Sequence, residues 1–242
     1  MWYAALWGGI AGSAVFMGAL AGILFQIKKK WIGTIMAFGT GVLIGAASFE
    51  LLSDSIEESG IMATSLGFLG GAALFTFVEY MISRKGGHER KRSRANPQGS
   101  SGLAIFIGTL IDAIPESVIV GVSLLENGKV SSLLVIAIFI SNFPEGLSSS
   151  VGLKKDGYSN TKILCLWLFV LILSALGSLI GFVFLENTTP TLIGVIGAFA
   201  AGGVVSMVAA AMMPEAYEEG GAIVGLITSL GLLCSLLLTQ FD

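Results

Sequence analysis

Two short stretches of this chain place an acidic residue directly after a proline, inside segments otherwise rich in Ile, Val, Leu and Ser. Residues 112–116 read Asp-Ala-Ile-Pro-Glu, and residues 141–145 read Ser-Asn-Phe-Pro-Glu. When the two stretches are aligned, proline falls on proline and glutamate on glutamate. Carboxylate, amide and hydroxyl oxygens are ligands that hard divalent cations accept. The repeated pattern therefore predicts cation binding.

Helical spacing would bring these oxygens together on one face of each segment. Asp112 and Glu116 are four residues apart, as are Ser141 and Glu145, and residues at that spacing share a helix face. Each proline also leaves the carbonyl four residues earlier without its helical donor. Two such faces set against each other would form a site for one or two divalent ions. The predicted ligands are Asp112, Glu116, Ser141, Asn142 and Glu145.

The alternative is a structural role, in which the prolines kink the helices and the acids are protonated or paired within a helix bundle. A carboxylate in the middle of a bilayer is costly, so acids at that depth usually face the protein interior or a water-filled path. No Lys or Arg lies inside the two hydrophobic segments to serve as a salt-bridge partner. The absence of a basic side chain that could pair with these acids favours metal binding over a purely structural role.

The composition places these segments in a membrane. The 242 residues are 54% hydrophobic and 12% charged, with a mean hydropathy of +0.87, whereas a soluble domain carries roughly twice that charge. The apolar residues fall in blocks of about 20, the length that crosses a bilayer as a helix. No basic region precedes the first block, so we expect a retained span and not a cleaved signal peptide. The sequence predicts an all-α polytopic membrane protein.

Eight transmembrane helices within one transmembrane domain account for the apolar blocks. A polar, basic linker at residues 84–101 divides three spans from five. Charge clusters or Gly, Pro and Asn turns separate the other spans. The predicted spans cover about residues 4–27, 31–53, 62–83, 102–124, 130–153, 162–185, 190–213 and 219–240.

The basic residues predict the orientation of the chain. With both termini outside, twelve of the thirteen Lys and Arg residues fall on the inner side, and only Lys129 falls outside. Cytoplasmic loops carry such an excess of positive charge, so the linker 84–101 is expected in the cytoplasm. The membrane is expected to be the plasma membrane. The charge run of the linker is explained by this topology, and no nucleic-acid partner is expected.

A second internal similarity relates the two ends of the chain. Residues 32–41 resemble residues 193–202, and the same alignment pairs 57–60 with 218–221. In the predicted topology the two copies cross the membrane in opposite directions. Such inverted repeats are typical of secondary transporters. The pattern predicts a 3+2+3 inverted-repeat arrangement with the two proline-containing spans at its centre.

At this point the motifs resemble those of a known family. Residues 142–147, Asn-Phe-Pro-Glu-Gly-Leu, resemble the His-Asn-x-Pro-Glu-Gly signature of the ZIP family of divalent-metal transporters, and residues 49–57 and 212–218 resemble the ends of that family's second and seventh spans. The resemblance implies a metal site, often binuclear, between the fourth and fifth spans at the residues predicted above. It also implies an outer entrance at Glu50 and a cytoplasmic exit at Glu215 and Glu218, with Glu219 beside them.

The chain departs from the family pattern in the type of ligand. Asp112 and Ser141 stand where the family carries His or Gln, and the sole histidine, His88, lies in the linker. Family precedent points to zinc, but a set of oxygen ligands favours harder ions such as Mn²⁺ or Fe²⁺. We expect zinc first, with Mn and Fe close behind and Cd as a further candidate. The metal is the substrate, and no organic cofactor is expected.

The resulting hypothesis is transport of divalent metal cations toward the cytoplasm. The alternative is a transport-inactive metal-sensing or scaffold membrane protein of the same fold. An enzyme is not expected, because neither the His-Glu-x-x-His pattern of metalloproteases nor a nucleotide-binding loop occurs in the sequence. The sequence leaves open whether the chain forms a homodimer.

Overall fold

The computed structural model describes residues 2–25, 27–84, 101–127 and 130–240, and every regular element in these ranges is helical. The predicted linker 84–101 lies almost entirely outside the described residues. Within the described part, six helical stretches are long and apolar enough to cross a membrane. The chain is therefore an all-α integral membrane protein. These stretches are Trp2–Leu24, Lys29–Met81, Phe106–Leu125, Ser132–Lys155, Asn160–Leu185 and Pro190–Leu238.

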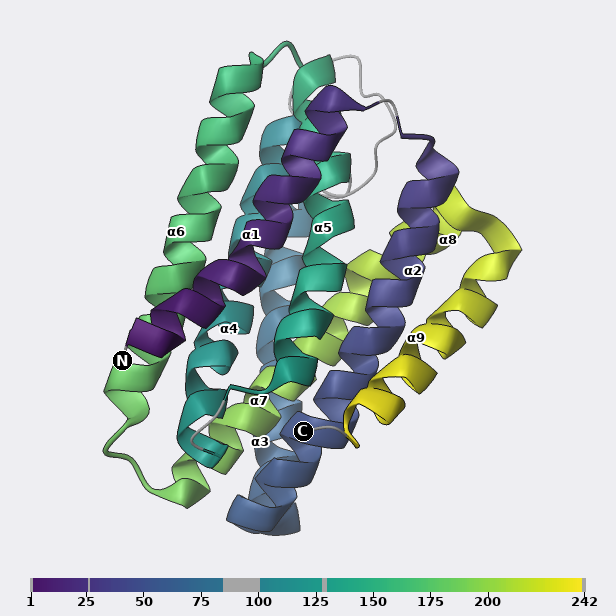
Figure 1. The fold of residues 1–242 in the computed structure, drawn as a ribbon. Helices are drawn as coiled ribbons and strands as arrows, with labels where there is room; N and C mark the ends of the chain where they lie inside the picture. The colour runs from purple at the N-terminus through teal and green to yellow at the C-terminus, as the bar shows by residue number, and fades with distance from the viewer. Residues whose placement is uncertain (1, 26, 85–100, 128–129, 241–242) are drawn as a thin grey trace.

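The helices form an elongated bundle with both described ends of the chain away from the loop that joins α1 to α2 (Figure 1). The α-helices are α1 (Trp2–Leu24), α2 (Lys29–Ala46), α3 (Leu52–Arg84), α4 (Ser101–Asn127), α5 (Ser132–Lys155), α6 (Asn160–Leu185), α7 (Pro190–Met207), α8 (Met213–Gly220) and α9 (Val224–Leu238). Two short π-helices, η1 (Ala47–Leu51) and η3 (Val208–Met212), and one 3₁₀ turn, η4 (Gly221–Ile223), interrupt them.

Three helices begin at a hydroxyl side chain that caps the first turn. Ser131, Ser159 and Thr189 have extended backbones, and their side chains accept hydrogen bonds from backbone amides three residues later. The donor–acceptor distances are 2.9, 3.3 and 3.4 Å for α5, α6 and α7. Because the first amides of a helix have no partner within it, Ser and Thr at this position fix where the helix starts.

The two longest helical stretches change direction at a glycine. A straight helix over the 53 residues of Lys29–Met81 would be about 80 Å long, far beyond the roughly 30 Å of a hydrocarbon core. Gly60 lies inside this stretch with φ 76° and ψ 160°, and Gly221 lies inside the other with φ 75° and ψ −159°. In Figure 1 the chain descends through α2 and returns through α3, then ascends through α7 and α8 and descends through α9.

Corresponding features of the two long stretches recur at the offset that relates residues 32–41 to residues 193–202 in the sequence. The bounds of α2 and α7 differ by this offset, as do those of the π-helices η1 and η3. The positive-φ glycines, Gly60 and Gly221, follow the same offset. Pro214 follows η3 and donates no amide hydrogen to the turn before it, but η1 forms without a proline at the corresponding position, Ser53. The same local irregularities thus recur at matching positions of two segments that run in opposite directions in Figure 1.

Glycine allows several helix pairs to pack at backbone distance. A Cβ atom at Gly18 of α1 would overlap the Phe143 carbonyl oxygen of α5, and one at Gly202 of α7 would overlap the Phe68 carbonyl oxygen of α3. Without a hydrophobic driving force between helices in lipid, such close contact supplies much of the attraction. The pairs α1–α5 and α3–α7 are therefore held by van der Waals contact between backbones.

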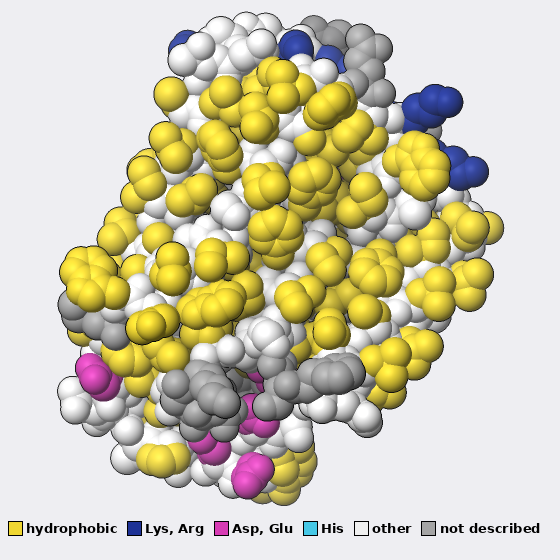
Figure 2. Space-filling view, viewed as in Figure 1, with side chains coloured by type: hydrophobic (Ala, Val, Ile, Leu, Met, Phe, Trp, Pro, Cys, Tyr) yellow, Lys and Arg dark blue, Asp and Glu magenta, His cyan; other side chains and the backbone are white. Residues whose placement is uncertain are grey.

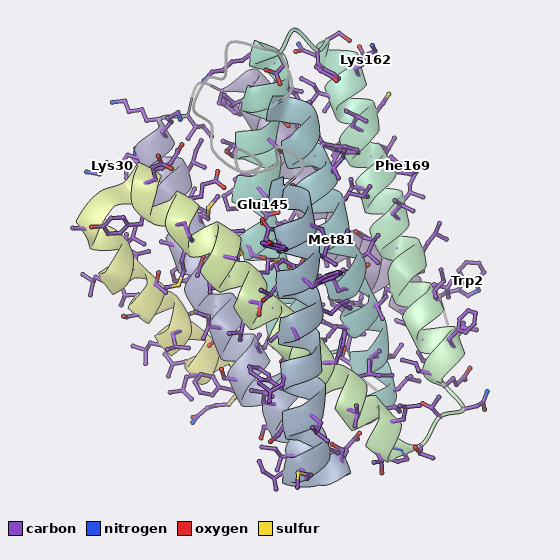
Figure 3. The ribbon with its side chains drawn as sticks, turned by 180° about the vertical axis from the view of Figure 1, so that it is seen from behind. Trp2, Lys30, Met81, Glu145, Lys162 and Phe169 are labelled. Carbon is purple, nitrogen blue, oxygen red and sulfur yellow. The ribbon has the colours of Figure 1, made fainter. Side chains whose placement is uncertain are left out.

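On the face drawn in Figure 2, charged side chains lie at the two ends of the molecule. Figure 2 shows lysines at one end, acidic side chains at the other and a hydrophobic surface between them. Lys30 and Lys162 lie at the same end in Figure 3, although they are far apart in the sequence. A wide apolar belt between two charged ends is the surface expected of a protein that spans a bilayer.

We expect Gly60→Ala and Gly221→Ala to destabilise the protein by about 1–3 kcal/mol each, because this backbone region is nearly closed to side chains with a Cβ. A Cβ at either position would meet no heavy atom within 4 Å, so the cost is one of backbone conformation alone. Gly225→Ala is the matched control, since Gly225 lies in α9 without a positive φ and also has open space around its Cβ position. Thermal unfolding in detergent measures the difference. Equal thermal midpoints for all three variants would contradict the positive-φ conformation of Gly60 and Gly221.

Candidate metal centre

The two proline-containing stretches meet through a hydrogen bond between α4 and α5. The Asn142 side-chain nitrogen donates to one Glu116 oxygen at 2.9 Å. Both side chains are only 3% exposed. Two polar groups from different helices are thus joined in a site from which solvent is largely excluded. The contact links the polar residues of α4 to those of α5.

The other three predicted ligands are also buried. Asp112 and Ser141 are each 1% exposed, and Glu145 is 5% exposed. Glu145 lies inside the bundle in Figure 3, away from the lysine end and from the opposite end. The Ser141 hydroxyl donates to the Ile138 carbonyl oxygen at 3.0 Å, so Ser141 can coordinate an ion only through a lone pair of its oxygen.

Glycines of α1 and α2 hold α5 in place around its proline. Both α4 and α5 continue as helices through Pro115 and Pro144. Pro144 removes the amide that would otherwise bond to the carbonyl of Ile140. A Cβ at Gly39 of α2 would lie 3.0 Å from that carbonyl oxygen, so the absence of a side chain lets α2 lie directly against it. Packing on α2 therefore covers the part of α5 that the proline weakens.

A second buried polar contact lies one helical turn beyond Glu145. The Ser148 hydroxyl donates to one Glu215 oxygen at 3.0 Å, and both side chains are buried. The contact joins α5 to α8. Sequence reasoning named Glu215 but missed Ser148, although Ser148 follows Glu145 by three residues and shares its helix face. That spacing was the signal that could have identified it.

An ion pair follows at the lysine end of the molecule. Lys29 at the start of α2 contacts Glu219 of α8 at 2.9 Å, with side-chain exposures of 51% and 9%. Nothing in the sequence predicts this pair, because it depends on how α2 packs on α8. Glu218, the neighbouring predicted exit residue, is exposed. The polar groups of α8 thus continue from the buried interior to the surface.

The predicted entrance residue lies toward the other end of α2. Glu50 belongs to the π-helix η1 and is partly buried. The acidic residues Asp54, Glu57 and Glu58 follow it in the first two turns of α3, before the turn at Gly60. Within the described residues, Glu50 and these acids do not gather with Glu116 or Glu145 into a group that could hold a metal ion. The entrance residue and the buried ligand set are therefore separate features of this conformation.

The carboxylates do not converge on a single point in this conformation. Across the described ranges, no group of three or more His, Cys, Asp or Glu side chains is close enough together to hold a metal ion. An ion at this position would need the amide and hydroxyl oxygens of Asn142 and Ser141 as well as acidic oxygens. Binding would also require rearrangement of side chains from α4 and α5.

Together the fold and this site define a class of protein, a helical membrane protein with acidic and amide side chains buried inside its bundle. Residues 82–239 match the sequence model of the family described as ZIP zinc transporter. Because this match covers more than half of the chain, the protein belongs to the ZIP family, as its motifs predicted.

Two relatives show how the similarity is distributed. A protein of Arabidopsis thaliana that carries a zinc-transporter name is 28% identical over 211 residues, which are 86% of this chain and 33% of the relative. The zinc transporter ZupT of Shigella dysenteriae serotype 1 is 25% identical over 143 residues, which are 59% of this chain and 47% of the relative. The aligned parts thus span about a third and about half of these two relatives.

Proposed function

We propose that this chain transports divalent metal cations across the membrane toward the cytoplasm, through a site between α4 and α5. The observation that carries the proposal is the buried hydrogen bond between Asn142 and Glu116. Asp112, Ser141 and Glu145, which are within four residues of them on the same two helices, are also buried. Acidic and amide groups at this depth are costly unless they serve an ion or a partner. Membership of the ZIP family supports the same conclusion.

Ion binding would replace internal hydrogen bonds with coordination. Asn142 donates to Glu116 through its nitrogen, which leaves its carbonyl oxygen as the atom that can coordinate a cation. Glu116 and Glu145 would supply the negative charge that offsets a divalent ion. Two facing helices with one such glutamate each allow the ion to be held from both sides, and small movements of either helix change its coordination.

The proposed order of metals is zinc first, with Mn and Fe close behind and Cd as a further candidate. The names of the relatives support zinc. The predicted ligands are oxygen atoms, which favour harder ions than imidazole or thiolate ligands do. A competition series therefore distinguishes a site that prefers zinc, as the names of its relatives suggest, from one that prefers the harder ions that its oxygen ligands favour.

The proposed topology has eight passes in a 3+2+3 inverted repeat, with both termini outside the plasma membrane. The matched spacing of α2 with α7, of η1 with η3 and of Gly60 with Gly221 supports the repeat. The concentration of lysines at one end supports a cytoplasmic position for that end. In this orientation Glu50 lies on the entrance side, and Ser148, Glu215 and Glu218 lead toward the exit.

Metal uptake into proteoliposomes made with purified protein tests this function. We expect accumulation of ⁶⁵Zn²⁺ that unlabelled Zn²⁺, Mn²⁺, Fe²⁺ and Cd²⁺ reduce in an order set by affinity. Empty vesicles provide the background. Metal binding by the purified protein without accumulation would favour the metal-sensing or scaffold alternative.

A further inference from the structure

A cavity of about 520 Å³ lies between α4 and the packed pair α3–α7. Asp112 and Glu116 are two of its fifteen lining residues, and the other thirteen are apolar or glycine. Its volume falls within the range of about 300–1,000 Å³ that small-molecule pockets occupy. The cavity therefore combines a large apolar wall with one acidic region. Asp112 and Glu116 are 1% and 3% exposed, so their side chains must turn toward the cavity to contact a ligand.

Metal transport does not explain the apolar part of this cavity. A divalent cation needs oxygen ligands or water around it, and hydrocarbon walls provide neither. Leu74 and Phe199 line the cavity and are 52% and 40% exposed. They lie in the middle of α3 and α7, within the apolar part of each helix. The walls are thus suited to a molecule that arrives from the hydrocarbon of the bilayer.

We propose that this cavity binds an amphiphilic amine, with its apolar body against α3 and α7 and its protonated nitrogen at Asp112 and Glu116. An ammonium group donates up to three hydrogen bonds, and those made to carboxylates are roughly twice as strong as neutral ones. The apolar body gains from leaving water in proportion to the area it buries. Charge complementarity selects the amine, because the two acids would repel a fatty acid and a neutral alcohol lacks the charge that they attract.

The amine and the transported metal would compete for the same oxygens. Asp112 and Glu116 belong to both sites, so occupation by one cation excludes the other. The binding of the amine does not require transport; only this competition rests on the proposed function. The cavity is thus a site through which a membrane-soluble cation inhibits metal binding.

Gly203 offers a way to close the cavity without disturbing the metal ligands. It lines the cavity, and a Cβ placed on it would meet no heavy atom within 4 Å. Gly203→Leu would extend a side chain into this open space. Gly225→Leu is the matched control, because Gly225 of α9 has equally open surroundings but does not line the cavity.

Isothermal titration calorimetry with 3,3-diphenylpropylamine and its uncharged analogue 3,3-diphenylpropan-1-ol tests the proposal on purified protein in detergent. We expect the amine to bind at least tenfold more tightly than the alcohol. Gly203→Leu should weaken amine binding at least tenfold, while Gly225→Leu should leave it unchanged. Saturating Zn²⁺ should weaken amine binding to the unaltered protein, and the amine should slow ⁶⁵Zn²⁺ uptake.

Equal affinity for amine and alcohol, or unchanged amine binding by Gly203→Leu, would overturn the proposal. If Gly203→Leu does not fold, Asp112→Asn replaces it, because this change removes a charge at constant volume and should also weaken amine binding. Amine binding by a protein that transports no metal would reject the proposed function and keep the cavity assignment. Transport without amine binding would do the reverse.

Discussion

Glu116→Gln and Glu145→Gln are each expected to reduce metal uptake to the level of empty vesicles. Each change removes one negative charge from a buried site at nearly constant volume, and at least one oxygen ligand is lost with it. Altering residues that merely support a metal ligand already costs about 10–100-fold in affinity. Loss of a glutamate ligand should therefore weaken binding by about a hundredfold or more. Competition uptake of ⁶⁵Zn²⁺ and direct titration of purified protein measure the two effects separately.

Glu186→Gln is the control for this pair of variants. Glu186 is an exposed glutamate at the end of α6, so this variant makes the same chemical change away from the buried site. Its metal uptake should match that of the unaltered protein. None of the three variants should have a lowered thermal midpoint, because Glu186 is exposed and an uncharged amide is easier to bury than a carboxylate at the other two positions. Unchanged uptake and affinity in both Glu116→Gln and Glu145→Gln would show that the transported ion does not use this site.

Gly202→Ala is expected to cause the largest loss of stability among single-methyl additions tested on α7. Its Cβ would overlap the Phe68 carbonyl oxygen and would lie 3.0 Å from the Ala72 amide nitrogen, both in the backbone of α3. Backbone atoms cannot rotate away as a side chain can, so the two helices must separate. Overpacking of this kind costs about 1–3 kcal/mol, and the loss of close contact along α3–α7 should place this variant at the upper end.

Gly203→Ala is the neighbouring control, because its Cβ would enter open space. Alanine is favoured over glycine within a helix by up to about 1 kcal/mol, so this variant should be as stable as the unaltered protein or slightly more stable. The thermal midpoints of both variants in detergent provide the comparison. A Gly202→Ala protein as stable as Gly203→Ala would mean that α3 and α7 are not in backbone contact in solution.

Much of the architecture follows from local properties of the chain. Hydrophobic blocks predicted helices that cross a membrane, since an apolar helix satisfies its own backbone hydrogen bonds in lipid. The similarity between the two ends was visible in the sequence, and its offset coincides with the matched positions of η1 and η3. Sequence reasoning predicted a second span that ends near residue 53 and a third that begins near residue 62; in the structure the helix continues past Asp54 and turns at Gly60. A solvated helix end tolerates charge, whereas only glycine readily adopts the backbone angles of the turn.

The sequence by itself determined which groups could do chemistry and that they would lie in helices. The Pro-Glu repeat, the four-residue spacing of Asp112 and Glu116 and the family motif are all local patterns. Only the tertiary structure decided which of these groups touch. The Asn142–Glu116 and Ser148–Glu215 hydrogen bonds each join two different helices. Their formation, like that of the cavity beside α4, depends on how closely the helix backbones approach at glycines. That distance is set by the packing of two helix surfaces, and no single segment of sequence determines it.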